Sequence, residues 1–123
     1  MVSVDLSHNH IVSISDKAFA RNSDMNHLKL DGNKIAHVSN KTFYGLSNVE
    51  VISLRGNAIE NLPEHLFKFA PKVQKIDLAR NSINSMHSQA FQVKIYNALQ
   101  KYFHYLAFTS HISTKSKNYE FSV

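Results

Sequence analysis

The chain has no cysteine among its 123 residues. This absence excludes disulfide frameworks, cysteine-containing zinc sites and thiol nucleophiles, and by itself it does not indicate a compartment. Residues that break regular structure are also scarce, with three glycines and two prolines. Because 43% of the residues are hydrophobic, the composition is that of a folded chain, and the length suits one modest domain rather than two.

Long runs of one character are missing as well. The most apolar stretch of the tail, residues 102–108, is far shorter than the roughly 20 residues that a membrane-spanning helix needs. The first ten residues lack the basic start and apolar run of a secretory signal. The net charge is +5, yet no five like charges are consecutive, so an arm that binds nucleic acid is not supported. We therefore expect no transmembrane segment and no nucleic-acid partner.

What the sequence does contain is an internal repeat with a period of 24 residues. An asparagine recurs at this spacing, and six columns around it hold an apolar residue in all four units. In the third unit these apolar residues are Val49, Ile52, Leu54, Ile59, Leu62 and Phe67. A repeat decides the architecture before any local prediction does. The units are residues 1–24, 25–48, 49–72 and 73–92 and beyond.

Each unit begins with alternating apolar and polar residues, as in Ile52-Ser53-Leu54. This alternation predicts a short strand with one face inward. Successive strands are separated by roughly 19 residues, and a connection of that length favours parallel pairing over a hairpin. Stacked coils of this kind form a solenoid, in which each unit buries its apolar residues against its neighbours.

The full pattern, L-x-x-L-x-L-x-x-N-x-I-x-x-L-x-x-x-x-F, resembles the leucine-rich repeat family in its typical 24-residue form, which is seen mainly in extracellular proteins. The stretches LPEHLF at residues 62–67 and YGL at residues 44–46 are similar to that form too. The resemblance covers residues 1 to about 92. It implies an α/β horseshoe, with a parallel β-sheet on the concave face and an irregular or 3-10 convex side.

Two columns of the repeat are interpreted as scaffold. Where the chain leaves each strand and turns, backbone groups point into the interior without strand partners, and an asparagine side chain both donates and accepts hydrogen bonds there. The predicted asparagine ladder consists of Asn9, Asn33, Asn57 and Asn81. Aromatic rings about 5–7 Å apart pack well, so a second stack is predicted for Phe19, Phe43, Phe67 and Phe91.

The outward-facing strand positions are the candidate binding residues, because the concave face is the usual ligand surface of the family. They are Asp5, Ser7, His27, Lys29, Asp31, Ser53, Arg55, Lys75 and Asp77. Across the strands their charges alternate in sign, with no basic stripe and no aromatic row. One interpretation is a solvated sheet face with cross-strand ion pairs. The other is a polar protein-recognition face.

Catalytic and metal-binding patterns have little support. His8 and His10 form the closest histidine pair, but they flank Asn9 and the pattern places no third ligand beside them. There is no glycine-rich phosphate loop, and no pair of acidic residues is placed in a pocket. We expect no enzyme activity, no metal and no cofactor. Asn40-Lys41-Thr42 is a glycosylation sequon, and the composition predicts such a sequon by chance.

The two ends depart from the repeat. Met1 already occupies a repeat column, so the chain reads as a fragment of a longer array; the alternative is a short natural protein. After residue 92 the repeat frame is lost. Residues 93–108 have helical apolar spacing and are interpreted as an amphipathic capping helix, followed by a disordered end. The main alternative for the tail residues 93–123 is sequence unrelated to the solenoid, such as read-through or an alternative exon. A basic aromatic helix on a membrane surface is a lesser alternative.

The sequence therefore predicts a non-enzymatic protein-recognition module that binds a protein ligand or co-receptor through its concave face. By resemblance, it is part of a cell-surface receptor, an adhesion protein or a secreted protein. An intracellular, cytoplasmic scaffold and a truncated product without a binding function remain as alternatives. Four strands of about five residues project only roughly 300 Å², whereas a standard interface needs about 800 Å² from each partner.

Overall fold

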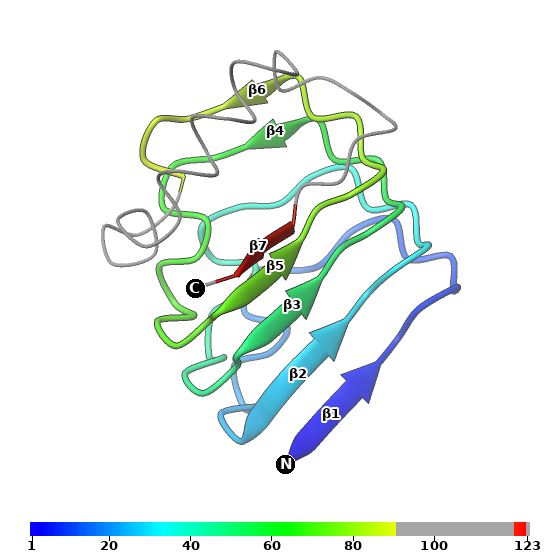
Figure 1. Cartoon of the computed structure of the whole chain (residues 1–123). Helices are drawn as coiled ribbons and strands as arrows, with labels where there is room; N and C mark the ends of the chain where they lie inside the picture. Colours follow the sequence, from blue (N-terminus) through cyan, green and yellow to red (C-terminus); the bar gives the residue numbers. More distant parts are fainter. Residues whose placement is uncertain (91–119, 123) are drawn as a thin grey trace.

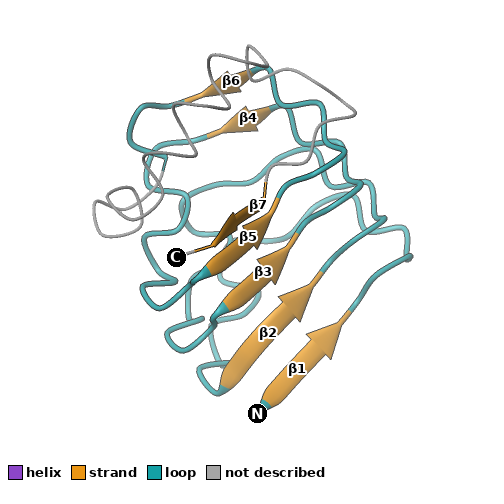
Figure 2. Cartoon of the chain, viewed as in Figure 1, coloured by secondary structure: helices purple, strands orange, loops and turns teal. Residues whose placement is uncertain are grey.

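The computed structural model describes residues 1–90 and 120–122, and these residues form a solenoid of stacked coils (Figure 1). The strands of the described part are β1 (Val2–Asp5), β2 (Met25–Lys29), β3 (Val51–Ser53), β4 (Asn61–Leu62), β5 (Lys75–Asp77), β6 (Ser85–Met86) and β7 (Glu120–Ser122). Loops connect the strands, and none of the described residues is helical (Figure 2). The predicted horseshoe with a parallel concave sheet is confirmed.

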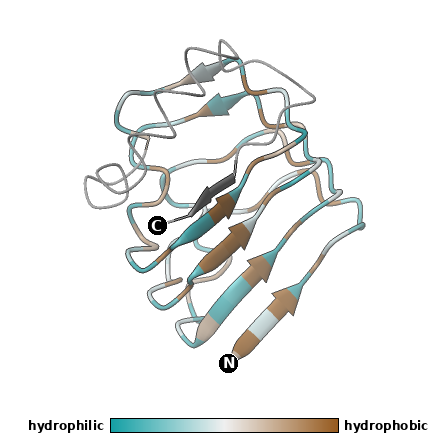
Figure 3. Ribbon diagram, in the orientation of Figure 1, coloured by the Kyte–Doolittle hydropathy of each residue, from teal (hydrophilic) through white to brown (hydrophobic). Residues whose placement is uncertain are grey.

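The concave sheet has the strand order β1-β2-β3-β5-β7. In this sheet β1, β2, β3 and β5 are parallel. Residues 24 apart face each other, as Lys29, Ser53 and Asp77 do. The register shifts once, between Val2 and Ser3 in β1. There the side chain of Asn26 accepts a hydrogen bond from the Val2 amide at 3.0 Å. Hydrophobic and hydrophilic residues alternate along β5 (Figure 3), as expected for a sheet with one buried face.

The core lies behind the sheet and consists of the apolar columns of the repeat. Leu30, Leu54 and Leu78 belong to one column, and each is at most 1% exposed. At the far side of the coils the rings of Phe43 and Phe67 stack with their centroids 5.5 Å apart. Phe19 is only partly buried at the end of this row, and the fourth predicted member, Phe91, lies outside the described residues.

The buried asparagines join neighbouring coils. The side-chain N–H groups of Asn57 donate to the carbonyl of Leu54 in its own coil and to the carbonyl of Leu30 in the preceding coil, both at 3.0 Å. Its side-chain oxygen accepts from the Ile35 amide of the preceding coil at 3.1 Å. Asn33 and Asn81 make the same set of bonds. Each of them thus supplies hydrogen bonds to backbone groups of two neighbouring coils, and those of Asn57 and Asn81 to Leu54 are buried.

The residue before each asparagine adopts a left-handed backbone conformation. Its φ is +57° at His8, +67° at Gly32, +72° at Gly56 and +57° at Arg80. Glycine adopts this conformation without steric cost, and other residues seldom do. At Gly32 a Cβ would also lie 2.4 Å from the exposed His8 ring, which would have to move to make room for it.

The convex side is irregular, as predicted, but it also contains a small parallel sheet of β4 and β6. The side chains of Asn61 and Ser85 are hydrogen-bonded across this sheet. The capping helix predicted for residues 93–108 lies outside the described residues. The end of the chain differs from the predicted disorder at residues 120–122, since β7 pairs with β5 in the antiparallel direction. Without this pairing, the outer N–H and C=O groups of β5 would form an open sheet edge.

Candidate protein-recognition surface

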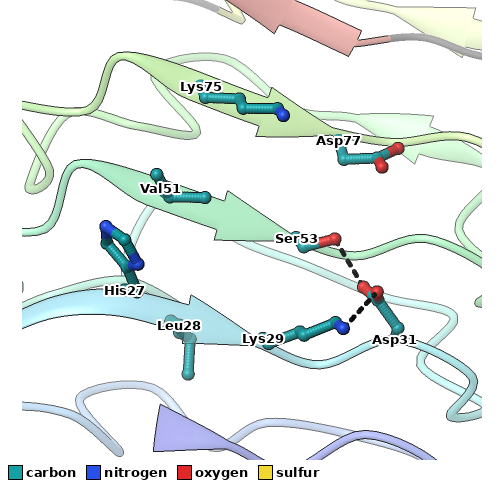
Figure 4. A pocket seen from close by; sticks show the side chains of 8 residues that line it. All are labelled: His27, Leu28, Lys29, Asp31, Val51, Ser53, Lys75 and Asp77. Atoms are coloured by element: carbon teal, nitrogen blue, oxygen red, sulfur yellow. Dashed lines mark hydrogen bonds and ion pairs between the residues drawn. The ribbon is translucent and has the colours of Figure 1, made fainter. Parts of the chain in front are cut away.

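The candidate binding residues lie side by side on the concave sheet because the strands are in register. His27 faces Val51 and Lys75, and in the next column Lys29 faces Ser53 and Asp77. These columns enclose a pocket of about 300 Å³ (Figure 4). Its lining is His27, Leu28, Lys29, Asp31, Val51, Ser53, Lys75 and Asp77. Six of the nine predicted residues therefore line one pocket, whereas Asp5, Ser7 and Arg55 lie outside it.

Asp31 is the centre of the polar contacts in this pocket. Its carboxylate accepts a hydrogen bond from the Ser53 hydroxyl at 2.5 Å and another from the Arg55 backbone N–H at 3.1 Å. The Lys29 ammonium lies 4.0 Å from the second carboxylate oxygen. Figure 4 shows the Ser53 and Lys29 contacts converging on the one side chain. Asp31 thus connects β2 to β3 by its contacts as well as facing the pocket.

The carboxylates of Asp77 and Asp5 accept hydrogen bonds from the backbone of their own coils. Each accepts a hydrogen bond at 2.9 Å from the backbone N–H two residues later, Ala79 and Ser7 respectively. These Asx turns close the strand ends. The Ser7 hydroxyl and then the Ser7 backbone N–H lower the pKa of Asp5, and the positive charge of Lys29 adds to this. Since the Ser7 hydroxyl has no partner in strict hydrogen-bonding geometry, the amide is the firmer contact.

The charges of the surface are unequally accessible. The side chains of Lys29 and Arg55 are 55% and 36% exposed, whereas those of Asp31 and Asp77 are 15% and 18% exposed. The two ion pairs, at 4.0 Å and 3.7 Å, are long. Pairs with one partner this exposed contribute about 0–1 kcal/mol, because water competes for both charges. The basic groups are therefore available to a ligand, while the acidic groups already accept hydrogen bonds within the sheet.

Two apolar residues also line the pocket and are absent from the predicted set. Val51 is half-buried and stands in the same column as His27 and Lys75. Its alternation places it on the outward face, so its position could be found from the sequence, but the prediction selected polar residues. Leu28 also lies in the lining, but it is 1% exposed and its side chain belongs to the buried core. The pocket is therefore less polar than the sequence prediction implied.

Three further features suggested by the sequence are a metal site, a membrane span and a glycosylation sequon. Within residues 1–90 and 120–122, no group of three or more histidine, aspartate or glutamate side chains is placed to hold a metal ion. No helix of the described part is long and apolar enough to cross a membrane. In the sequon, Asn40 is exposed. Thr42 is 1% exposed, and its hydroxyl oxygen accepts a hydrogen bond from the Ser39 amide at 2.7 Å.

Comparison with known proteins gives the family. The leucine rich repeat family matches residues 1–59 and 47–93, which together span most of the chain. The chain belongs to the leucine-rich repeat family. The solenoid, the asparagine ladder and the parallel concave sheet are the structure expected of a leucine-rich repeat protein.

Two solved structures resemble this leucine-rich repeat chain. A chain of the Toll–Spatzle complex from Drosophila matches 73% of it with a TM-score of 0.70 and 18% identity, and at that identity the likeness concerns the fold. A chain of the TLR13–ssRNA13 complex matches 75% of it with a TM-score of 0.52 and 27% identity. The matched part is 12% of the first chain and 16% of the second. A comparison with curated proteins gives no match.

Proposed function

We propose that this leucine-rich repeat chain is a non-enzymatic recognition module of a receptor-like protein, and that it binds a protein ligand or co-receptor through its concave sheet. We place it at the cell surface or outside the cell. Membership of the leucine-rich repeat family supports a recognition role. Both similar structures were solved as complexes, one with Spatzle and one with an ssRNA.

The observation that carries the proposal is the unequal exposure of charge on the concave face. The heads of Lys29 and Arg55 are open to solvent, while Asp31 and Asp77 are mostly covered and already hydrogen-bonded. A ligand that presents carboxylates would pair with the two basic groups without displacing the contacts of the acidic ones. Beside them, Val51 offers a half-buried apolar contact. The proposed ligand surface is therefore acidic, with an apolar side chain at its centre.

The concave sheet of these coils supplies only part of a standard interface. Its projected area of roughly 300 Å² follows from strand spacing and length, and a stable partner buries about 800 Å² on each side. Since the chain spans 12% and 16% of the two similar chains, the proposed interface also uses loops or further coils.

The test compares two variants with the same net charge. Lys29→Glu/Arg55→Glu reverses two exposed concave charges, and Lys34→Glu/Lys41→Glu reverses two exposed charges outside the concave pocket. The chain is screened by biolayer interferometry against a panel of extracellular protein domains. A domain that binds the wild-type chain should lose at least about tenfold in affinity with the concave variant and keep its affinity for the control variant. Binding that is indifferent to the concave variant would overturn the proposal.

A further inference from the structure

A second surface lies at the loops that lead into the strands, and it does not depend on the concave face. Residues of three successive coils line an open groove of about 500 Å³. Its lining is Ala20, Ser23, Tyr44, Gly45, Ser47, Lys68, Phe69 and Pro71. We propose that this groove binds an acidic peptide segment with an aromatic side chain, supplied by a partner protein.

One loop position in the groove lining has no side chain, which lets two coils pack closely. Gly45 has a φ of +98°, and a Cβ there would lie 2.5 Å from the Phe19 carbonyl oxygen and 2.6 Å from the Ala20 Cα. Backbone atoms cannot give way by that much, so only glycine fits. The same position holds Arg21 in the preceding coil and Phe69 in the following one. The absence of a side chain at Gly45 therefore lets the loops of the first two coils lie in contact where they line the groove.

Two aromatic rings form the apolar part of the groove. Tyr44 and Phe69 come from neighbouring coils and meet edge to face, with centroids 4.8 Å apart and planes at 70°. Both side chains are half-buried, so each ring is held in place by the loops while part of it remains open. An aromatic or proline side chain of a peptide can pack beside rings held in this way.

Basic groups border the rings. The Lys17 ammonium lies 5.1 Å from the Tyr44 ring centre, and the Lys68 ammonium lies 5.4 Å from the Phe69 ring centre. Within residues 1–90 and 120–122, neither lysine forms an ion pair with a carboxylate. The groove lining includes no acidic residue, and Asp24, which follows the lining residue Ser23, is not part of it. The charge of the groove is complementary to an acidic segment.

The loops that carry the groove are tied together before any ligand binds. The Asn48 side chain donates to the Ser23 carbonyl of the preceding loop at 2.7 Å and accepts from the Lys72 ammonium of the following loop at 2.8 Å. Each loop also contains the same tight turn, from Phe19 to Asn22, from Phe43 to Leu46 and from Phe67 to Ala70. A preformed groove loses little entropy on binding.

The ring geometry favours a peptide over single-stranded nucleic acid. Successive bases stack on open aromatic faces, but the two rings are almost perpendicular and a lysine lies over a face of each. The hydroxyl groups of Ser23 and Ser47 in the lining can instead hydrogen-bond to a peptide backbone. Nucleic acid is therefore tested as the competing ligand.

The probe is a copolymer of glutamate and tyrosine, with poly-glutamate and poly-uridine as comparisons, and calorimetry measures their binding to the full chain. We expect the copolymer to bind more tightly than poly-glutamate. Lys17→Glu/Lys68→Glu should weaken the copolymer by at least about tenfold, and Tyr44→Ser should remove its advantage over poly-glutamate. Lys34→Glu/Lys41→Glu replaces two exposed lysines outside the groove and the concave sheet. It has the same net charge and should leave copolymer binding unchanged, and the concave variant Lys29→Glu/Arg55→Glu is measured beside it.

Three outcomes would overturn the groove proposal. The first is equal binding of the copolymer and poly-glutamate, which would mean that the rings take no part. The second is a loss confined to the concave variant Lys29→Glu/Arg55→Glu, which would place the peptide on the sheet and leave the concave proposal standing. The third is tighter binding of poly-uridine that is lost in Lys17→Glu/Lys68→Glu. Circular dichroism of each variant checks that the substitutions leave the fold intact.

Discussion

The first and third coils share one sequence pattern but differ in how much of it they bury. Leu54 of the third coil is fully buried, whereas the equivalent Leu6 of the first is 36% exposed. Asn57 binds to two coils, whereas Asn9 donates only to Leu6 and Ser7 of its own coil within the described residues. The pattern therefore identifies residues that can be buried or can bind another coil. A neighbouring coil on each side is what makes them do so.

The largest expected contrast is between Phe67→Ala and Phe19→Ala. Phe67 is fully buried and stacked on Phe43, so its truncation leaves a cavity and should lower the free energy of unfolding by about 4 kcal/mol. Phe19 is only partly buried, and its truncation should cost about 1–2 kcal/mol. Urea denaturation followed by circular dichroism measures both. Equal losses would mean that the place of a phenylalanine in the stack, inside or at its end, does not determine how much it contributes to the free energy of unfolding.

Asn57→Ala should be the next most damaging change. It leaves the Ile35 amide without its partner, and it removes one hydrogen bond from each of the carbonyls of Leu30 and Leu54. These carbonyls keep the side chains of Asn33 and Asn81 as donors. A buried polar group without a partner costs about 1–3 kcal/mol and a lost hydrogen bond about 1 kcal/mol, so we expect a loss of about 3 kcal/mol in the same urea experiment.

Asn9→Ala is the matched control for this substitution. Asn9 is exposed, and water can replace its bonds, so its loss should cost less than about 1 kcal/mol. We infer that the asparagine ladder stabilises the fold by hydrogen bonds between coils rather than by turns within a coil. A comparable loss for the two variants would contradict this.

The two edges of the concave sheet offer a smaller contrast. β5 pairs with β7 at one edge, whereas β1 has a strand on one side only among the described residues. Deleting residues 120–123 should accelerate amide hydrogen exchange about tenfold at the β5 amides that face β7. Amides of the interior strand β2 serve as the internal control. Unchanged exchange in β5 would show that β7 does not protect the edge in solution.

The smallest expected effect concerns Asp5 in the first coil. Because Ser7 lowers the pKa of Asp5 in the folded chain, the ionised carboxylate stabilises the fold above about pH 4, the pKa of an unfolded aspartate, and this contribution is lost as the pH falls through the folded pKa. Asp5→Asn removes it. The fall in melting temperature between pH 7 and pH 2.5 should therefore be smaller in Asp5→Asn than in the wild-type chain.

Asp24→Asn is the control for the pH experiment. Asp24 is an exposed carboxylate without a hydrogen-bond partner within the described residues. We expect its variant to lose as much melting temperature on acidification as the wild-type chain does. If Asp5→Asn and Asp24→Asn behave alike, the Asp5 turn contributes nothing that depends on pH.

Most of the fold was predictable because the same apolar positions recur in all four repeat units. The column of Leu6, Leu30, Leu54 and Leu78 predicts a buried row, and the spacing of 24 residues predicts parallel strands in register. The left-handed position before each asparagine was not predicted. Only Gly32 and Gly56 signal it, while His8 and Arg80 adopt the same conformation without being glycine.

The candidate site was predictable in its membership but not in its accessibility. Alternation along the strands identified Lys29, Asp31, Arg55 and Asp77 as outward-facing. It could not say that Asp31 accepts hydrogen bonds from the neighbouring strand, because that contact depends on side-chain conformation. The loop groove was not predicted at all, since Tyr44 and Phe69 are 25 residues apart and occupy different columns of the repeat.

By itself the sequence determined the period, the strand register and the residues that form the core. A repeated apolar pattern is buried when equivalent coils stack in register, so that equivalent residues meet. The tertiary structure alone decided which equivalent residues are buried, which charges stay open to a ligand, and where β7 pairs. These properties depend on what lies beside a residue in space. For Leu6 and Leu54, which share a column of the repeat, that neighbourhood is different.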